Sequence, residues 1–203
     1  MNRYFDIAFA EQSQTLQRRR GSFDGYQSMA AHGEGNSVLG PDEIAFLQQR
    51  DSIYLASIGA HGWPYVQHRG GPAGFVKVLD PTHLAWGDRI GNRQFVSAGN
   101  IEHDNRISII AVDYPNRQRL KLYGRATFDT EPDGELLAEL NITERLEGLI
   151  VVNVEAFDWN CPKFITPRFT AEHIRSITDP LQSQIVSLKA ELADAKKMLT
   201  AIK

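Results

Sequence analysis

From Asp51 onward the sequence alternates apolar and polar residues over short runs, and this period of two most constrains the fold. Such runs predict β-strands, and they occur at 52–58, 64–69, 74–80, 83–87, 106–114, 119–129 and 148–159. Turn-forming residues separate them, for example Gly59-Ala60-His61-Gly62 and Pro115-Asn116. Short strands joined by tight turns predict a mainly β (α+β) fold, with an antiparallel sheet closed into a barrel rather than alternating βαβ units.

Helices are predicted around this sheet. Helical spacing of apolar residues predicts one helix near the N-terminus, which ends at Gly21 after three arginines. Residues 22–40 are rich in Gly and Ser and are predicted to be irregular, and a further helix is predicted over 41–50. Helical insertions are expected at about 91–103 and 132–146. We therefore divide the chain into an N-terminal arm (1–40), a barrel domain (41–178) and a C-terminal helix (179–203).

The C-terminal helix carries an apolar seam with alternating gaps of four and three residues. Its members are Leu181, Ile185, Leu188, Leu192, Ala195, Leu199 and Ile202. This spacing is typical of a coiled coil, and Asp179 before Pro180 is a candidate N-cap. The helix either packs on its own domain or contacts another subunit, and the narrow seam with charged flanks favours the second alternative.

Overall composition excludes several classes of protein. A net charge of −3 argues against a dedicated nucleic-acid binder, and no apolar run approaches the length of a membrane span. The charged N-terminal residues lack the apolar core of a signal peptide, and the single cysteine, Cys161, excludes an internal disulfide. These features predict a soluble cytoplasmic protein.

Two glycine-containing stretches combine fixed positive charge with exposed backbone donors. In the first, Arg69 precedes Gly70 and Gly71, and its guanidinium is suited to phosphate or carboxylate oxygens. Taken alone, this stretch is more typical of a surface arginine that forms a salt bridge beside a glycine turn. The second stretch favours an anion-binding site, because it combines several hydrogen-bond donors before a predicted helix start, where anions bind favourably. Its candidate residues are Trp86, Gly87, Asp88, Asn92, Arg93, Ser97 and Asn100.

The order of these motifs resembles the pyridoxamine 5′-phosphate oxidase-like family of FMN-binding split barrels. The resemblance covers about residues 40–175 and continues through "DNRISIIAVDY", "RLKLYGRATF" and "FDWNCPKFITPRFT". Within the last of these, the run "WNCPKFI" resembles a signature of a flavin-binding branch of the family. The resemblance implies a split β-barrel with flanking helices that works as an obligate homodimer with FMN as cofactor.

The same resemblance implies roles for individual residues. It implies that Arg69, Arg93 and Ser97 hold the FMN phosphate, with Asn92 and Asn100 nearby. It also implies that the flavin ring lies against backbone near Gly70-Gly71 and near Gly87-Asp88. The partner subunit would close this cleft with the segment matching Trp159 to Phe164, so Lys163 is a candidate contact from the partner. Trp86 could flank the flavin ring, although a tryptophan in a barrel is more often part of the core.

Function is less constrained than fold. The C-terminal "PRFTAEHIR" departs from the basic motif that grips the substrate phosphate in true pyridoxamine phosphate oxidases, so that substrate is not expected here. One hypothesis is an FMN-dependent oxidoreductase of unknown substrate, for which the sequence identifies no catalytic residue. The alternatives are a non-catalytic flavin carrier or stress protein, and a haem or deazaflavin binder of the same fold.

Cysteine and histidine chemistry is not expected to contribute. Cys161 is interpreted as a small buried apolar residue beside the cleft, in preference to a nucleophile activated by Lys163. The six histidines, at positions 32, 61, 68, 83, 103 and 173, lack close metal-ligand spacing, and no metal site is expected.

Overall fold

The computed structural model describes residues 2–32, 36–159 and 161–201. Two residues of the sequence predictions lie outside the described residues. They are Asn160 of the predicted family motif and Ile202 of the predicted heptad seam. The chain divides into two units, Met1–Asp113 with Gln118–Lys163, and Tyr114–Arg117 with Phe164–Lys203. The N-terminal helices thus belong to the same unit as the sheet.

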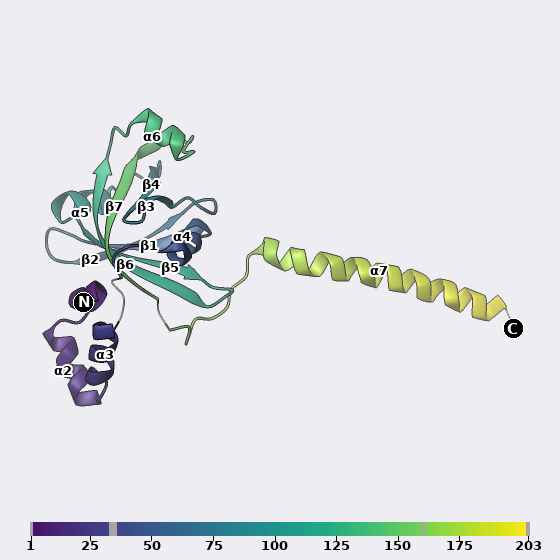
Figure 1. Ribbon diagram of the computed structural model, residues 1–203. Coiled ribbons are helices and arrows are strands. Elements are labelled where there is room, and N and C mark those ends of the chain that lie inside the picture. Colours follow the sequence, from purple (N-terminus) through teal and green to yellow (C-terminus); the bar gives the residue numbers. More distant parts are fainter. Residues whose placement is uncertain (1, 33–35, 160, 202–203) are drawn as a thin grey trace. The chain divides into compact units, whose positions relative to one another are not determined.

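The first unit is built on a seven-stranded antiparallel sheet (Figure 1). Its strands are β1 (Ser52–Ile58), β2 (Pro64–Gly70), β3 (Lys77–Asp80), β4 (His83–Arg89), β5 (Arg106–Asp113), β6 (Gln118–Asp129) and β7 (Leu146–Trp159). They are ordered β2-β1-β5-β6-β7-β4-β3, so β2 and β3 are the end strands. All seven predicted strands are present, and the predicted α+β split-barrel class is confirmed.

Alternating burial along the strands explains why this sequence forms the sheet. In β5 the residues at 107, 109, 111 and 113 are buried, while their neighbours are partly or fully exposed. One face of the sheet therefore forms a continuous apolar core that includes Leu55, Trp86, Ile109 and Ile150. Burial of such side chains is the main favourable contribution to folding.

Helices occupy the connections and the chain ends. They are α1 (Arg3–Ala8), α2 (Glu11–Arg20), α3 (Phe23–His32), α4 (Pro41–Gln48), α5 (Val96–His103), α6 (Gly134–Glu139) and α7 (Ala171–Ala201). At the start of α4, Pro41 occupies the first turn and Glu43 accepts a hydrogen bond from the backbone N–H of Gly40. None of the helices in the described part of the chain combines the length and apolarity that a membrane span requires.

Three helix predictions are corrected. The predicted single N-terminal helix is two helices, because the backbone of Phe9 and Ala10 leaves the helical conformation between α1 and α2. The segment 22–40, predicted to be irregular, contains α3. The C-terminal helix begins at Ala171 and includes Pro180, and Asp179 is not its cap. Thr170 takes that place, since its hydroxyl accepts a hydrogen bond from the backbone N–H of His173.

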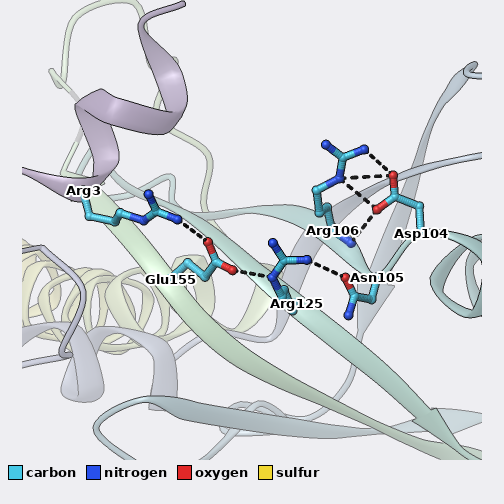
Figure 2. Close-up of polar contacts among 6 residues, drawn as sticks. All are labelled: Arg3, Asp104, Asn105, Arg106, Arg125 and Glu155. Atoms are coloured by element: carbon cyan, nitrogen blue, oxygen red, sulfur yellow. Dashed lines mark hydrogen bonds and ion pairs between the residues drawn. The ribbon is translucent and has the colours of Figure 1, made fainter.

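The N-terminal helix α1 is anchored to the sheet by charge and by aromatic packing. Figure 2 shows Arg3 donating to Glu155, which also accepts from Arg125, while Arg125 reaches Asn105. Burial acts to raise the pKa of Glu155, but the two guanidinium groups outweigh it and the pKa is lowered. The ring of Tyr4 lies 5.4 Å from that of Tyr123 on β6. These contacts hold α1 against β6 and β7.

Candidate functional site

A small pocket of about 70 Å³ forms where β2, the end of β4 and the loop before α5 meet. The residues that line it are Tyr65, Gln67, Arg69, Asp88, Arg89, Gly91, Asn92, Arg93, Gln94, Phe95, Val96 and Glu147. Four predicted site residues, Arg69, Asp88, Asn92 and Arg93, are therefore brought together from three separate elements. We call this the arginine pocket.

Arg69 lies at the inner side of the arginine pocket and forms an ion pair with Asp88. Its Nη1 donates to Oδ1 of Asp88, and the two side chains are only 16% and 9% exposed. The Nε of Arg69 is buried and has no hydrogen-bond partner among the described residues. A buried guanidinium donor without a partner is costly, which makes this atom a candidate donor to a bound anion.

The carboxyl group of Asp88 has a pKa above the ordinary range for aspartate. Burial is the largest cause and raises the pKa, Arg69 opposes it, and the nearby carboxylate of Glu147 adds to the rise. The burial effect outweighs the attraction of Arg69. The ion pair that occupies Arg69 is therefore easier to break by protonation than an ordinary aspartate–arginine pair.

Arg93 and Arg89 are also matched with acidic residues. Nε of Arg93 lies 2.7 Å from Oε1 of Glu147, and Nη2 of Arg89 lies 2.8 Å from Oε1 of Glu144. Three arginines at this site thus face three carboxylates, so an incoming anion must compete with them for the guanidinium groups. Arg93 remains 59% exposed, which leaves most of its guanidinium open to solvent.

The loop before α5 holds Arg93 in an unusual backbone conformation. Arg93 has φ 58° and Phe95 has φ 52°, in the left-handed region that non-glycine residues rarely adopt. Such conformations concentrate at functional sites. Phe95 is the N-cap of α5 and provides no side-chain hydrogen bond to the first turn, so the helix start beside the pocket has no side-chain cap.

Two further predicted residues lie behind the arginine pocket. Ser97 is 1% exposed, and its hydroxyl donates to Oε1 of Gln67 at 2.7 Å, which connects it to the pocket wall. The amide of Asn100 donates to the hydroxyl of Ser57 on β1 and does not line the pocket. Ser97 is thus one hydrogen bond away from the pocket, whereas Asn100 supports α5 against the sheet.

The glycines have a packing role that the sequence did not indicate. A Cβ at Gly71 would lie 2.6 Å from Cβ of Phe75, and one at Gly87 would lie 2.6 Å from Cδ2 of Leu146. The space beside both glycines is filled by the chain itself. These contacts fill only the Cβ side of the two glycines, and the approach of the flavin ring to their backbone stays a prediction. Gly70, the last residue of β2, has His68 close to the position of a Cβ.

Trp86 and Cys161 also differ from their predicted roles. Trp86 is 1% exposed within the hydrophobic core, so it does not flank the arginine pocket. Cys161 is exposed, which corrects its interpretation as a buried apolar residue. It lines a separate cavity of about 580 Å³ together with Tyr26 and Trp159. Lys163 is exposed and does not line the arginine pocket, and its contact with a partner subunit stays a prediction.

Sequence reasoning missed eight of the twelve residues that line the pocket, namely Tyr65, Gln67, Arg89, Gly91, Gln94, Phe95, Val96 and Glu147. Tyr65 and Gln67 alternate with Arg69 along β2 and so share its face, a signal that the period of two contains. Glu147 comes from a position more than 50 residues further along the chain, and only the pairing of β4 with β7 brings it near. No local pattern indicates it.

We expect sulfate to bind the arginine pocket more tightly as the pH falls from neutral toward the raised pKa of Asp88. Sulfate remains a dianion over this range, while the raised pKa of Asp88 means that its carboxyl takes up a proton earlier than an ordinary aspartate. Protonation releases Arg69 for the anion. Isothermal titration calorimetry with sodium sulfate at several pH values measures the effect.

The control variant for this pH dependence is Asp88→Asn. This substitution removes the charge of Asp88 and leaves the ion pairs of Arg93 with Glu147 and of Arg89 with Glu144 in place. Asp88→Asn should bind sulfate at high pH as tightly as the wild type does at low pH, with a weaker dependence on pH. An unchanged pH dependence in this variant would contradict the role of Asp88.

Comparison with known proteins identifies the family. The family model described as "Pyridoxamine 5'-phosphate oxidase" matches residues 41–163. The crystal structure of HupZ from Group A Streptococcus is 14% identical with a TM-score of 0.50, and the match covers 64% of this chain and 99% of that one. HutZ, the haem storage protein of Vibrio cholerae, gives 19% identity, a TM-score of 0.40 and coverage of 60% and 94%.

General Stress Protein 26 from Bacillus anthracis gives 14% identity, a TM-score of 0.42 and coverage of 64% and 95%. No curated protein sequence matches the chain. At these identities the solved structures bear on the fold alone, and of these three HupZ reaches a TM-score of 0.50. Because the family model spans more than half of the sequence and includes β1 to β7, the chain belongs to the pyridoxamine 5′-phosphate oxidase family.

Proposed function

We propose that this chain binds FMN, with the phosphate group in the arginine pocket, and acts as a flavin-dependent oxidoreductase of the split-barrel family. The observation that carries the proposal is the buried, unpartnered Nε of Arg69 at a site with two further arginines. Charge-assisted hydrogen bonds from guanidinium groups are a common means of holding phosphate. The uncapped start of α5 beside the pocket adds backbone N–H donors.

The donor set fits a phosphate group better than a haem. The residues that line the arginine pocket include neither histidine nor cysteine, the usual axial ligands of haem iron. Arg69 and Arg93 would hold the phosphate, and Ser97 would keep Gln67 oriented at the pocket wall. When bound, FMN would supply the hydride or electron transfer, while the chain binds and orients it.

We also propose that the flavin site is completed by a second copy of the chain. The outer face of β1, β2 and β5 exposes Tyr54, Val66 and Ile110, and register places Tyr54 opposite Ile110. On β2, Val66 lies between the pocket residues Tyr65 and Gln67 and so belongs to the other face of the strand. An exposed apolar face of this kind is typical of a subunit interface. A dimer at this face would place the second subunit next to the strand that carries Arg69.

Comparing FMN with riboflavin tests the proposal. The purified protein should be yellow, and denaturation should release FMN. Riboflavin lacks the phosphate, so its affinity for the apoprotein should be weaker by roughly ten-fold or more, the value of a charge-assisted hydrogen bond. Equal affinity for the two flavins would contradict the phosphate assignment, and a Soret band in the purified protein would show haem in place of flavin.

Reduction of the bound flavin then separates an enzyme from a carrier. Bleaching of the flavin absorbance by NADH or NADPH, followed by recovery in air, is expected for an oxidoreductase. A flavin that stays oxidised with both nucleotides, and that only dithionite reduces, would favour a carrier or stress protein of the same fold.

A further inference from the structure

Within the described part of its own unit, helix α7 has no partner for its apolar side chains. It runs for 31 residues, and no residue within Ala171–Ala201 is buried. Leu181, Leu192 and Leu199 are each more than half exposed. In the described part of its unit, α7 is the only helix or strand, so this unit offers nothing that covers the seam (Figure 1). An uncovered seam of this length in water predicts association.

The spacing of the exposed apolar residues identifies the partner as another helix. The alternating gaps of four and three place Ile185, Leu192 and Leu199 at the a positions of a heptad repeat. Leu181, Leu188 and Ala195 then occupy the d positions. We propose that α7 pairs with α7 of a second copy of this chain as a parallel, two-stranded coiled coil.

The charges beside the seam determine the parallel orientation. In this register Lys189 and Lys196 occupy e positions, and Glu191 occupies a g position. In a parallel pair each g residue faces the e residue of the next heptad on the partner, so Glu191 meets Lys196 of the partner subunit. In an antiparallel pair the e positions face one another and lysine meets lysine. The charges therefore favour the parallel pair.

Pro180 does not interrupt this interface. In the same register it lies at a c position, outside the a and d positions that face the partner. The helix is already established before Pro180, since Thr170 caps it and the backbone N–H of Ile174 donates to the carbonyl of Thr170. The full helix extends for roughly 46 Å at 1.5 Å per residue, and the seam occupies its C-terminal part.

Disulfide trapping in the full-length chain tests both the pairing and its orientation. In a Cys161→Ser background, Leu199→Cys places a thiol on the seam, and Lys197→Cys places one on the opposite face of the same turn. A parallel pair brings the two copies of residue 199 to within disulfide distance. An antiparallel pair centred between Leu181 and Leu199 would separate them by about 27 Å. Mild oxidation should convert Leu199→Cys to a covalent dimer and leave Lys197→Cys monomeric on a non-reducing gel.

Two further variants make the result specific to the seam. Adding Leu188→Glu to the Leu199→Cys chain should abolish the covalent dimer. Adding Val186→Glu, which introduces the same charge at an exposed apolar residue outside the seam, should not. A covalent dimer that survives Leu188→Glu would overturn the proposal.

Mixed oxidation reports orientation directly, because Leu181→Cys and Leu199→Cys chains should each link only to their own kind. A dominant link between residues 181 and 199 would overturn the parallel assignment. These readouts are independent of flavin, so failure of the coiled coil and failure of the FMN site remain distinguishable.

Discussion

Replacing Arg50 by methionine is expected to lower the free energy of unfolding by about 3–5 kcal/mol, because it breaks a buried ion pair from one side. Nη2 of Arg50 lies 2.9 Å from Oδ2 of Asp113, and both side chains are about nine-tenths buried. Nε of Arg50 also donates to the carbonyl of Phe46, and Nη1 donates to that of Val112. The residue therefore joins the end of α4 to β5. Urea denaturation followed by circular dichroism measures the loss.

Two other variants establish that burial is the cause. Arg106→Met removes an arginine that also pairs with an aspartate, Asp104, but Arg106 is 65% exposed, and its loss should barely move the denaturation midpoint. The double variant Arg50→Met/Asp113→Leu removes both buried charges and should regain a large part of the lost stability. It also keeps the test decisive if the single variant does not fold. If Arg50→Met were as stable as Arg106→Met, the buried pair would have no stabilising role.

Arg69→Ala and Asp88→Asn are expected to change FMN affinity in opposite directions. Loss of Arg69 removes hydrogen bonds to the phosphate worth about 1.5–3 kcal/mol, which weakens binding by roughly ten-fold to 150-fold. Loss of the Asp88 charge removes the competitor for the same guanidinium and should strengthen binding, by roughly ten-fold if one charge-assisted contact is gained. Fluorescence titration of the apoprotein with FMN measures both changes.

Riboflavin is the matched ligand for these two variants. Since both substitutions act on the phosphate, riboflavin affinity should stay the same in the wild type, Arg69→Ala and Asp88→Asn. Thermal unfolding of each variant reports whether the ion pair also supports the fold. If Asp88→Asn weakened FMN binding as much as Arg69→Ala, then Asp88 would be organising the pocket and not competing with the ligand.

The strands were predictable from the sequence because the signal for them is local. Alternation in "RISI" matches the observed burial at the start of β5, whereas the apolar Ile110 is exposed and the charged Asp113 is buried. The turns between strands carry glycine or proline. The order of strands in the sheet was not predictable in this way. The pairing of β4 with β7 joins residues about 65 positions apart, and periodicity contains no information on such a pairing.

The predicted helix boundaries were wrong where a local rule for Pro, Gly or Ser competed with other contacts of the same segment. A proline after an aspartate usually starts a helix, but residues 171–179 are helical before Pro180 because Thr170 caps them. Similarly, the Gly and Ser content of residues 22–40 indicated an irregular segment, yet the aromatic packing of Tyr26 against Phe5 and Phe9 stabilises α3. In α7 a local cap outweighed the proline rule, and in α3 tertiary contacts outweighed propensity.

The sequence predicted which hydrogen-bond donors meet at the candidate site, but not the ion pairs that connect them to acidic residues. The two arginine-containing stretches do meet in one pocket, as the order of motifs indicated. The structure shows the salt bridge that the sequence suggested for Arg69, while its binding to an anion stays a prediction. In the described part of the chain its buried Nε has no hydrogen-bond partner, which supports that prediction. The acidic partners of the arginines could not be assigned, since Glu147 reaches Arg93 only through the sheet.

The sheet order has a consequence for how the protein's motions can be observed. β7 is hydrogen-bonded to β6 along one edge and to β4 along the other, whereas β2 pairs only with β1. Amide protons in β7 should therefore exchange with solvent only when the whole unit opens, while those of β2 can exchange through local fraying of an end strand. Because β2 carries Arg69, a bound anion would slow exchange in β2 and leave the relative protection within β7 unaltered. A single hydrogen-exchange experiment would thus report the occupancy of the arginine pocket on β2 and the global stability of the unit on β7.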